Sequence, residues 1–276
     1  MNPIESAKMR SSRRDADHTG GTTVRLTKAA VPSVVRVRFP SCSRELDYFN
    51  DKFDLQPGDA VFVDGKLAGQ RGRVTAVSTH FRIRPDDYKR VIGLADTCVS
   101  GEFLNAGSYL VTFDLCALPY SRFRSWVLPP LDGGTEYFVC FGADSMDLNA
   151  PAAWPFAFDV MSRGTDYYRS GRVQYLSLDG ARGRAIVDGT RPYEVRFEYD
   201  GGRITDLTCS CPCGYHCKHE AAVLLQLREI LEVIEKRYPD ARACSGGFSA
   251  VRAPLLVSLA VEGNDRAILT LEQSAR

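Results

Sequence analysis

Hydrophobic and polar residues alternate most regularly between residues 193 and 199. One face of this segment carries Tyr193, Val195, Phe197 and Tyr199, and the other carries Glu194, Arg196 and Glu198. A period of two predicts a β-strand with one buried face and one face in water. Similar strands are predicted at 172–178, 184–187 and 203–208, and Asp-Gly turns separate them. Together the four strands indicate an antiparallel meander.

The pattern changes to a helical one after residue 220. Large aliphatic residues recur at the spacing of one helical face, at Val223, Leu227, Ile230, Leu231 and Ile234. The other face carries Gln226, Arg228, Glu229, Glu232 and Lys236. This periodicity predicts an amphipathic helix over 220–238, which Pro239 ends. A shorter helix is expected upstream, after Pro155 and before the first strand of the meander.

The rest of the chain is mostly strand-like. Short apolar segments with Gly-containing turns over 31–96 predict a small SH3-like β-barrel or meander, and 97–150 continue with mixed β character. Two prolines near 151–155 mark a boundary. After the long helix, 253–261 and 267–271 are predicted as strands joined by a hairpin at 262–265.

We therefore predict an α+β protein that is mostly β. Its parts are a disordered basic tail at 1–30, a β-rich domain at 31–150, a metal-bound hairpin and helix at 151–240, and a C-terminal β extension at 241–276. The tail has few large apolar residues and carries Lys8, Arg10, Arg13 and Arg14. It is either a solvated terminus or an arm that tethers phosphates.

Composition excludes a few classes of protein. The 276 residues are 44% hydrophobic and 25% charged with a net charge of +1, so the chain has no overall basic character. It contains no apolar run of membrane-spanning length and no secretory signal at its N-terminus, so we expect a cytoplasmic protein without membrane contact. Cys42, Cys98, Cys116 and Cys140 stand singly in strand-like surroundings and are expected to be buried free thiols.

Candidate chemistry is concentrated in one segment. Residues 208–220 read T-C-S-C-P-C-G-Y-H-C-K-H-E, with four cysteines and two histidines. A structural zinc site usually takes two ligands from each of two short segments. Cys209 with Cys211, and Cys217 with His219, form two such pairs, at the end of a strand and the start of a helix.

This arrangement resembles the SWIM zinc finger family, whose signature is C-x-C, a spacer and C-x-H. Pro212, the C-K-H triplet and the upstream segments SRGTDYYRSGRV and AIVDGTRPYEVRF agree with bacterial members, so the resemblance covers about 155–238. It implies Zn²⁺ held by Cys209, Cys211, Cys217 and His219. Cys213 is an alternative to Cys211, and His216 is expected to be a partly exposed neighbour of the site.

Such a site is expected to be structural rather than catalytic. Four good ligands close the coordination shell, whereas a catalytic zinc keeps one position open. The surplus negative charge of three thiolates could be offset by Lys218 and Arg203. The chain also lacks H-E-x-x-H, Walker A, G-x-G-x-x-G and G-x-S-x-G motifs, so we expect no enzymatic activity.

The resemblance implies a partner that is nucleic acid, with DNA favoured, or another protein. Candidate phosphate contacts are Arg163, Arg169, Arg172, Arg182, Arg184 and Lys218, interleaved with tyrosines. Alternatively these arginines pair with nearby acids on a solvated face. A second basic and aromatic group is Arg122, Phe123, Arg124 and Trp126, which is a stacking platform if exposed and packing if buried. The competing hypothesis is an adaptor that binds a protein complex through the finger and the polar face of helix 220–238.

Overall fold

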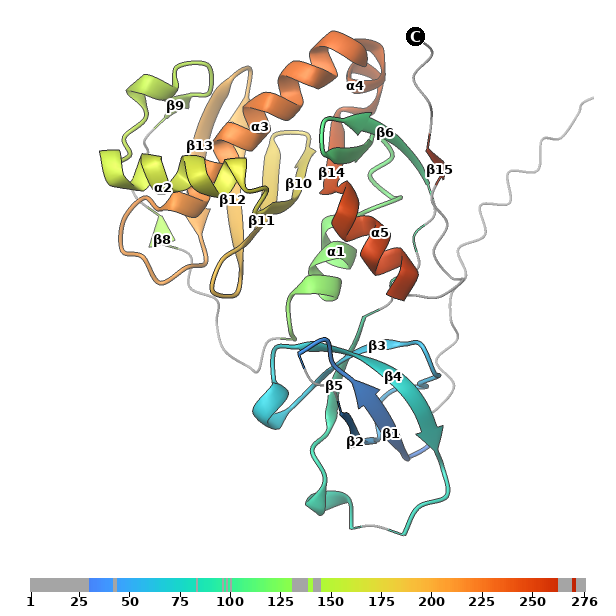
Figure 1. Cartoon of the computed structure of the whole chain (residues 1–276). Coiled ribbons are helices and arrows are strands. Elements are labelled where there is room, and N and C mark those ends of the chain that lie inside the picture. The colour runs from blue at the N-terminus through green and yellow to red at the C-terminus, as the bar shows by residue number, and fades with distance from the viewer. Residues whose placement is uncertain are drawn as a thin grey trace, which may run out of the picture.

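The computed structural model describes residues 30–41, 44–82, 84–95, 97, 99, 101–130, 139–140, 145–262 and 270–271. It contains a small sheet from the N-terminal part of the chain, a large sheet, and helices that pack on both faces of the large sheet (Figure 1). The predicted class, α+β and mostly β, is confirmed. The predicted disordered tail lies outside the described residues, apart from residue 30.

The small sheet has five antiparallel strands in the order β2-β1-β4-β3-β5. They are β1 (Ser33–Arg38), β2 (Glu45–Asn50), β3 (Ala60–Val63), β4 (Arg71–Ser78) and β5 (Val91–Ala95), with the 3₁₀ turns η1 (Gly65–Leu67) and η2 (Pro85–Asp87) between them. Alternate residues such as Val35 and Val37 fill its core. Of the predicted barrel or meander, the closed barrel does not form: β2 and β5 are the outer strands of the sheet, and among the described residues a single isolated bridge links Phe49 of β2 to Arg90, just before β5.

The large sheet follows the order β15-β6-β7-β14-β10-β11-β12-β13-β8, and β9 pairs with β13. Its strands are β6 (Glu102–Ala106), β7 (Tyr109–Thr112), β8 (Val139–Cys140), β9 (Met146–Asp147), β10 (Val173–Asp179), β11 (Arg182–Asp188), β12 (Pro192–Asp200), β13 (Arg203–Cys209), β14 (Gly247–Arg252) and β15 (Thr270–Leu271). All pairs are antiparallel except β15 with β6. The meander predicted over 172–208 is confirmed as β10 to β13.

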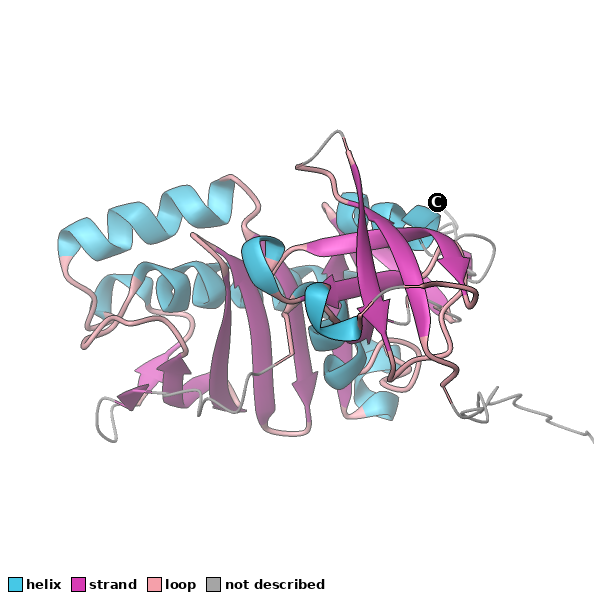
Figure 2. Cartoon of the chain, turned by 90° about the horizontal axis from the view of Figure 1, so that it is seen from below, coloured by secondary structure: helices cyan, strands magenta, loops and turns pink. Residues whose placement is uncertain are grey.

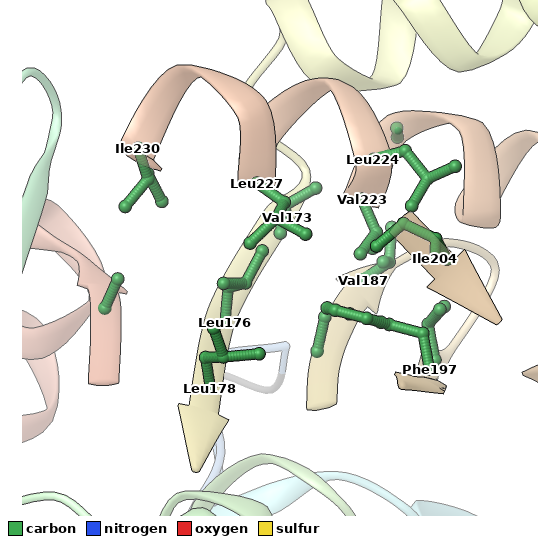
Figure 3. Close-up of a cluster of buried hydrophobic side chains, with 14 of the residues drawn as sticks. Val173, Leu176, Leu178, Val187, Phe197, Ile204, Val223, Leu224, Leu227 and Ile230 are labelled. Carbon is green, nitrogen blue, oxygen red and sulfur yellow. The ribbon is translucent and has the colours of Figure 1, made fainter. Parts of the chain in front are cut away.

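One face of the large sheet is covered by two helices, α2 (Phe158–Arg169) and α3 (Lys218–Arg237) (Figure 1). Both helices were predicted. The apolar face of α3 lies on alternate residues of the meander, and Figure 3 shows Leu227 and Val223 of α3 against Val173 and Val187 of the sheet. The 3₁₀ turn η3 (Pro151–Ala153) precedes α2, and the short helix α4 (Pro239–Ser245) follows α3.

The other face of the large sheet packs on α1 (Tyr120–Val127), α5 (Ala253–Glu262) and the small sheet. Phe62 of β3, Trp126 of α1 and Ile186 of β11 share this second core. Figure 2 shows the small sheet apart from the pair of helices that lines the large sheet. The meander is therefore covered on both faces over part of its area.

Burial from both sides corrects one prediction. Glu194 was expected on the solvent-facing side of its strand, but it is fully buried. Its carboxylate lies 2.5 Å from Nε of Arg196 and 3.5 Å from Nε of Arg124 on α1. Period-two alternation distinguishes the two faces of a strand but does not reveal that a second layer covers one of them.

The C-terminal prediction is wrong in part. Residues 253–261 form helix α5 instead of a strand, with Leu256 and Leu259 buried at a spacing of one helical turn. Pro254 is tolerated because it lies in the first turn, where no intrahelical bond needs its missing N–H. The strand β14, which lies between β7 and β10, was not predicted. The hairpin expected at 262–265 falls almost entirely outside the described residues.

The sheets group the chain differently from the predicted domains. β6 and β7, from the segment expected to extend the N-terminal domain, belong to the large sheet. The domain boundaries themselves stay a prediction. Cys116 is exposed, contrary to the expected buried thiol. No helix in the described part of the chain has both the length and the apolar character needed to cross a membrane.

Gly164 allows α2 to approach α3 closely. A Cβ at this position would lie 2.5 Å from Cβ of Ala221 and 3.1 Å from the carbonyl oxygen of Lys218. We predict that Gly164→Leu destabilises the protein by about 1–3 kcal/mol because the helices must separate. Urea unfolding measures the difference, with Ser162→Leu on the exposed side of α2 as the control. Equal stability of the two variants would contradict the close packing.

Candidate metal centre

Four side chains from the end of β13 and the start of α3 converge. Cys209 is the last residue of β13, Cys211 lies in the following loop, Cys217 caps α3, and His219 is in its first turn. Their donor atoms all lie within 4.8 Å of one another, and all four residues are buried. These are the four residues that the sequence predicted as ligands.

The distances between these donors fit a zinc ion. Nδ1 of His219 lies 3.8 Å from Sγ of Cys209 and 3.6 Å from Sγ of Cys217. Zn–S and Zn–N bonds of ordinary length in a tetrahedron place sulfur and nitrogen about 3.5 Å apart. Nε2 of His219 lies beside Gly189, where an added Cβ would approach it to 3.1 Å. The ring therefore presents Nδ1 to the three sulfurs.

The thiols also need a cation for electrostatic reasons. Hydrogen bonds from Cys209 and Cys217 lower the pKa of the Cys211 thiol. Hydrogen bonds to Cys211 and Cys217, together with burial, raise the pKa of Cys209, because a second thiolate would stand beside the first. Zinc binds thiolates, and a divalent charge at the centre would favour the deprotonated form of all three. The donor set thus fits Zn²⁺, which would act as a crosslink between strand and helix.

Glu220 braces the loop that carries the ligands. Its carboxylate accepts a hydrogen bond of 2.9 Å from the backbone N–H of Cys217 and lies 3.0 Å from Nδ1 of His216. Burial raises the pKa of Glu220 to about 7, against the opposing effect of these two contacts. Glu220 lies three residues after the N-cap residue Cys217, and this contact between its carboxylate and the N-cap backbone is a capping box. It holds the ligands Cys217 and His219 in a fixed helix start.

The two additional candidate ligands lie next to the site. His216 forms a hydrogen bond with Glu220, and its ring lies 5.4 Å from that of Phe156. These contacts give His216 a role in supporting the loop. Cys213 is half-buried and outside the group of four donors. Burial and a hydrogen bond to Cys211 raise its pKa, while the positive charges of Lys218 and Arg163 act in the opposite direction.

Aromatic rings enclose the ligand His219. Its ring lies 4.7 Å from that of Tyr193 and 5.4 Å from that of Tyr167. The ammonium of Lys218 and the guanidinium of Arg172 lie 4.5 Å and 5.1 Å from the centre of the Tyr167 ring. Sequence reasoning treated these tyrosines only as possible stacking or core residues, because nothing in their spacing indicates the histidine between them.

The six candidate nucleic-acid contacts do not form one surface. Arg163, Arg169, Arg172 and Lys218 come from α2, the turn after it and the start of α3. Arg182 and Arg184 lie on the opposite face of the large sheet, because the residue between them, Gly183, faces the core under α3. Arg163 pairs with Asp159 at 2.8 Å and Arg172 with Asp188 at 3.4 Å, so the alternative of local ion pairs holds for these two.

Two further expectations are corrected or decided by the structure. Arg203 opens β13, at the opposite end of the strand from Cys209, and its Nε donates to Ser145 Oγ at 3.0 Å, so it is too distant to offset the thiolates. Phe123 and Trp126 are fully buried on α1, which makes them packing residues and excludes a stacking platform there.

Three sulfurs and one nitrogen, held by a strand end and a helix start, define a structural zinc-binding module. Residues 193–228 match the family described as SWIM zinc finger, so this part of the chain, from β12 into α3, is a SWIM zinc finger that binds Zn²⁺. Comparison of the chain with curated proteins and with solved structures finds no match.

We predict one zinc ion per chain, bound through these four residues. Cys217→Ser is expected to remove it, whereas Cys213→Ser is expected to keep the full zinc content, because Cys213 lies outside the group of donors. Atomic emission spectroscopy on gel-filtered protein measures the stoichiometry. If Cys213→Ser loses as much zinc as Cys217→Ser, the ligand set is different.

Trp154 reports on the metal centre. It packs on Phe156, which packs on His216, whereas Trp126, the other tryptophan, is buried in the second core. In Trp126→Phe, a zinc chelator is expected to shift the remaining fluorescence to the red as the ligand loop loosens. Trp154→Phe serves as the control and is expected to show a much smaller shift. Equal shifts in both variants would show that zinc does not act locally.

Proposed function

We propose that the zinc finger is a non-catalytic nucleic-acid-binding module with DNA as its ligand. The observation that supports this most strongly is the layer of cations over the tyrosines that enclose His219. Lys218 and Arg172 lie over Tyr167, and the guanidinium of Arg191 lies 5.5 Å from the centre of the Tyr193 ring. These cations are held in place by tyrosines that pack on a zinc ligand, and positively charged side chains in fixed positions suit contacts with phosphates.

The ion pairs on this surface are compatible with such contacts. Arg172 and Asp188 have side chains that are 42% and 49% exposed, so their 3.4 Å contact is a weak surface pair. A phosphate with its stronger charge could replace it. Arg163 and Asp159 are similarly exposed. Lys218 and Arg191 provide further positive charge on the same side.

Exposed aromatic rings flank the loop that carries the ligands. Tyr215 in the loop is 58% exposed and Phe158 at the start of α2 is 90% exposed. The contact of Phe156 with His216 brings the start of α2 beside the loop. Exposed rings next to basic residues are the usual platform on which bases of a single strand stack. This combination favours nucleic acid as the partner.

The proposal includes the absence of catalysis. The four ligands fill a tetrahedral shell, which leaves no position for an activated water. Because a zinc–thiolate site requires reduced cysteines, we infer a reducing compartment such as the cytoplasm.

The adaptor hypothesis would use the exposed face of α3. That face carries equal numbers of acidic and basic residues, namely Arg228, Glu229, Glu232, Glu235, Lys236 and Arg237. Glu232 and Lys236 pair at 3.3 Å, as on an ordinary solvated helix. This balance supports the adaptor less than the cation layer supports nucleic acid.

The test is binding of the zinc-loaded protein to single-stranded DNA, duplex DNA and RNA across a salt series. We expect the logarithm of affinity to fall linearly with the logarithm of salt concentration, because phosphate contacts release counterions. Lys218→Gln and Arg191→Gln should each make the slope shallower by about one unit.

Arg237→Gln is the matched control, because it lies at the far end of the same helix and should leave affinity and slope unchanged. Binding with wild-type affinity by the double variant Lys218→Gln, Arg191→Gln would exclude this surface. Absence of binding to all three nucleic acids at low salt would favour the adaptor.

A further inference from the structure

The first two turns of α3 do not have the exposure that reading a DNA groove requires. His219, Glu220 and residues 221–224 are all buried, because α2 and the meander pack against them. The close approach of Gly164 to Ala221 belongs to this contact. A helix that reads a duplex must present its side chains to the base edges in the major groove. The start of α3 is therefore unsuited to the readout of paired bases.

Exposed aromatic rings are found at this same end of the module. Among the residues that the structure describes, five large hydrophobic side chains are exposed, and Phe158 and Tyr215 are the two aromatic ones. Phe158 is the first residue of α2, and Tyr215 lies in the loop between β13 and α3. This loop passes beside the start of α2, where His216 contacts Phe156 (Figure 1). Single exposed apolar residues are common, but two rings on adjacent segments form a local feature.

Neither ring is needed by the core of the protein. The buried residues of α2 are Val160 and Gly164, whereas Phe158 is 90% exposed. The aromatic residue two positions earlier, Phe156, is the one that packs inward, on Trp154 and His216. A large aromatic side chain that leaves water on binding contributes strongly to an interface. The exposed rings are thus free to contact a ligand.

Positive charge lies close to the two rings. Lys218 is three residues after Tyr215, and it forms no ion pair with any residue in the described part of the chain. Burial raises the pKa of the Cys213 thiol, and the positive charges of Lys218 and Arg163 act against this effect, so both cations lie near the ligand loop. Asp159 offsets Arg163 at 2.8 Å. The ammonium of Lys218 is therefore the group placed to contact a phosphate beside Tyr215.

We propose that Phe158 and Tyr215 stack on unpaired bases, so that the nucleic acid bound by the zinc finger is single-stranded DNA. In a duplex the faces of each base are covered by its neighbours, whereas an unpaired base offers its face to an aromatic ring. Stacking accepts any base, because every base has a π-face, so we expect no strong sequence preference. The inference rests on the function proposed above and specifies which form of DNA the same surface takes.

The experiment is fluorescence anisotropy of zinc-loaded protein with two labelled strands of equal length, about 12 nucleotides. One strand is thymidine throughout, and the other has abasic sites in place of the bases, so both carry the same phosphates. We expect the thymidine strand to bind about fivefold or more tightly, because the abasic strand cannot stack. The salt dependence should be the same for both strands, because the phosphate contacts are the same.

Changes to the two rings test the same claim from the side of the protein. Phe158→Ala and Tyr215→Ala should each weaken binding of the thymidine strand about fivefold or more, and should leave the salt dependence and the affinity for the abasic strand unchanged. Tyr215→Phe keeps a ring and should bind as wild type does. Phe158→Leu keeps an apolar side chain without a ring and should lose as much as Phe158→Ala. Wild-type binding by Phe158→Leu would contradict stacking.

Val257→Ala is the matched control. It truncates another exposed apolar side chain, on α5, which packs on the opposite face of the large sheet from α2 and α3, and it should leave binding unchanged. Zinc content and urea unfolding should match wild type in each variant, because the changed side chains are exposed.

The outcomes separate this inference from the function on which it rests. If both strands bind equally and Lys218→Gln still makes the salt dependence shallower, the stacking inference is overturned and the phosphate-binding function stands. If neither strand binds at low salt, both are overturned. A duplex of the same length gives a third test: a loss of duplex affinity in Phe158→Ala as large as the loss for the single strand would place the ring between paired bases and overturn the inference.

Discussion

The geometry of the module depends on the meeting of the end of β13 with the start of α3. Cys209, Cys211, Cys217 and His219 place three sulfurs and one ring nitrogen within 4.8 Å of one another in a buried position. Without a cation, ionisation of one thiol opposes ionisation of the next by repulsion: hydrogen bonds from Cys209 and Cys217 lower the pKa of Cys211, whereas hydrogen bonds to Cys211 and Cys217, together with burial, raise the pKa of Cys209. A zinc ion turns the repulsion into attraction and fixes the direction in which α3 leaves the sheet. The apolar face of the helix then covers the meander.

The large sheet separates two surfaces with different chemistry. On the helical side, the cations Lys218, Arg172 and Arg191 lie over tyrosines that enclose a zinc ligand. On the other side, Arg184 and Arg196 face each other across β11 and β12, and Arg196 contacts the buried carboxylate of Glu194. The meander β10–β13 lies between the two surfaces: β13 ends at the zinc ligand Cys209, and β11 and β12 carry the arginine pair.

Much of this organisation could be predicted from the sequence. The period of two at 193–199 and the helical spacing after Val223 indicate the meander and α3, and the paired Cys and His residues indicate the metal site. What local patterns omit is the second layer. The burial of Glu194 depends on α1, which is distant in sequence. The segment 253–262 is apolar at nearly every position, so its sequence pattern does not distinguish a helix from a strand. For the same reason, six candidate arginines and lysines proved to occupy two opposite faces.

The central claim, that zinc holds β13 and α3 together, is tested most directly by hydrogen–deuterium exchange with and without a chelator. Removal of zinc is expected to reduce the protection of backbone amides in 203–228 strongly, because the helix start and strand end lose their crosslink. Amides in the small sheet, which has its own core, are expected to keep their protection. Unchanged protection in the first two turns of α3 after complete removal of zinc would contradict the account.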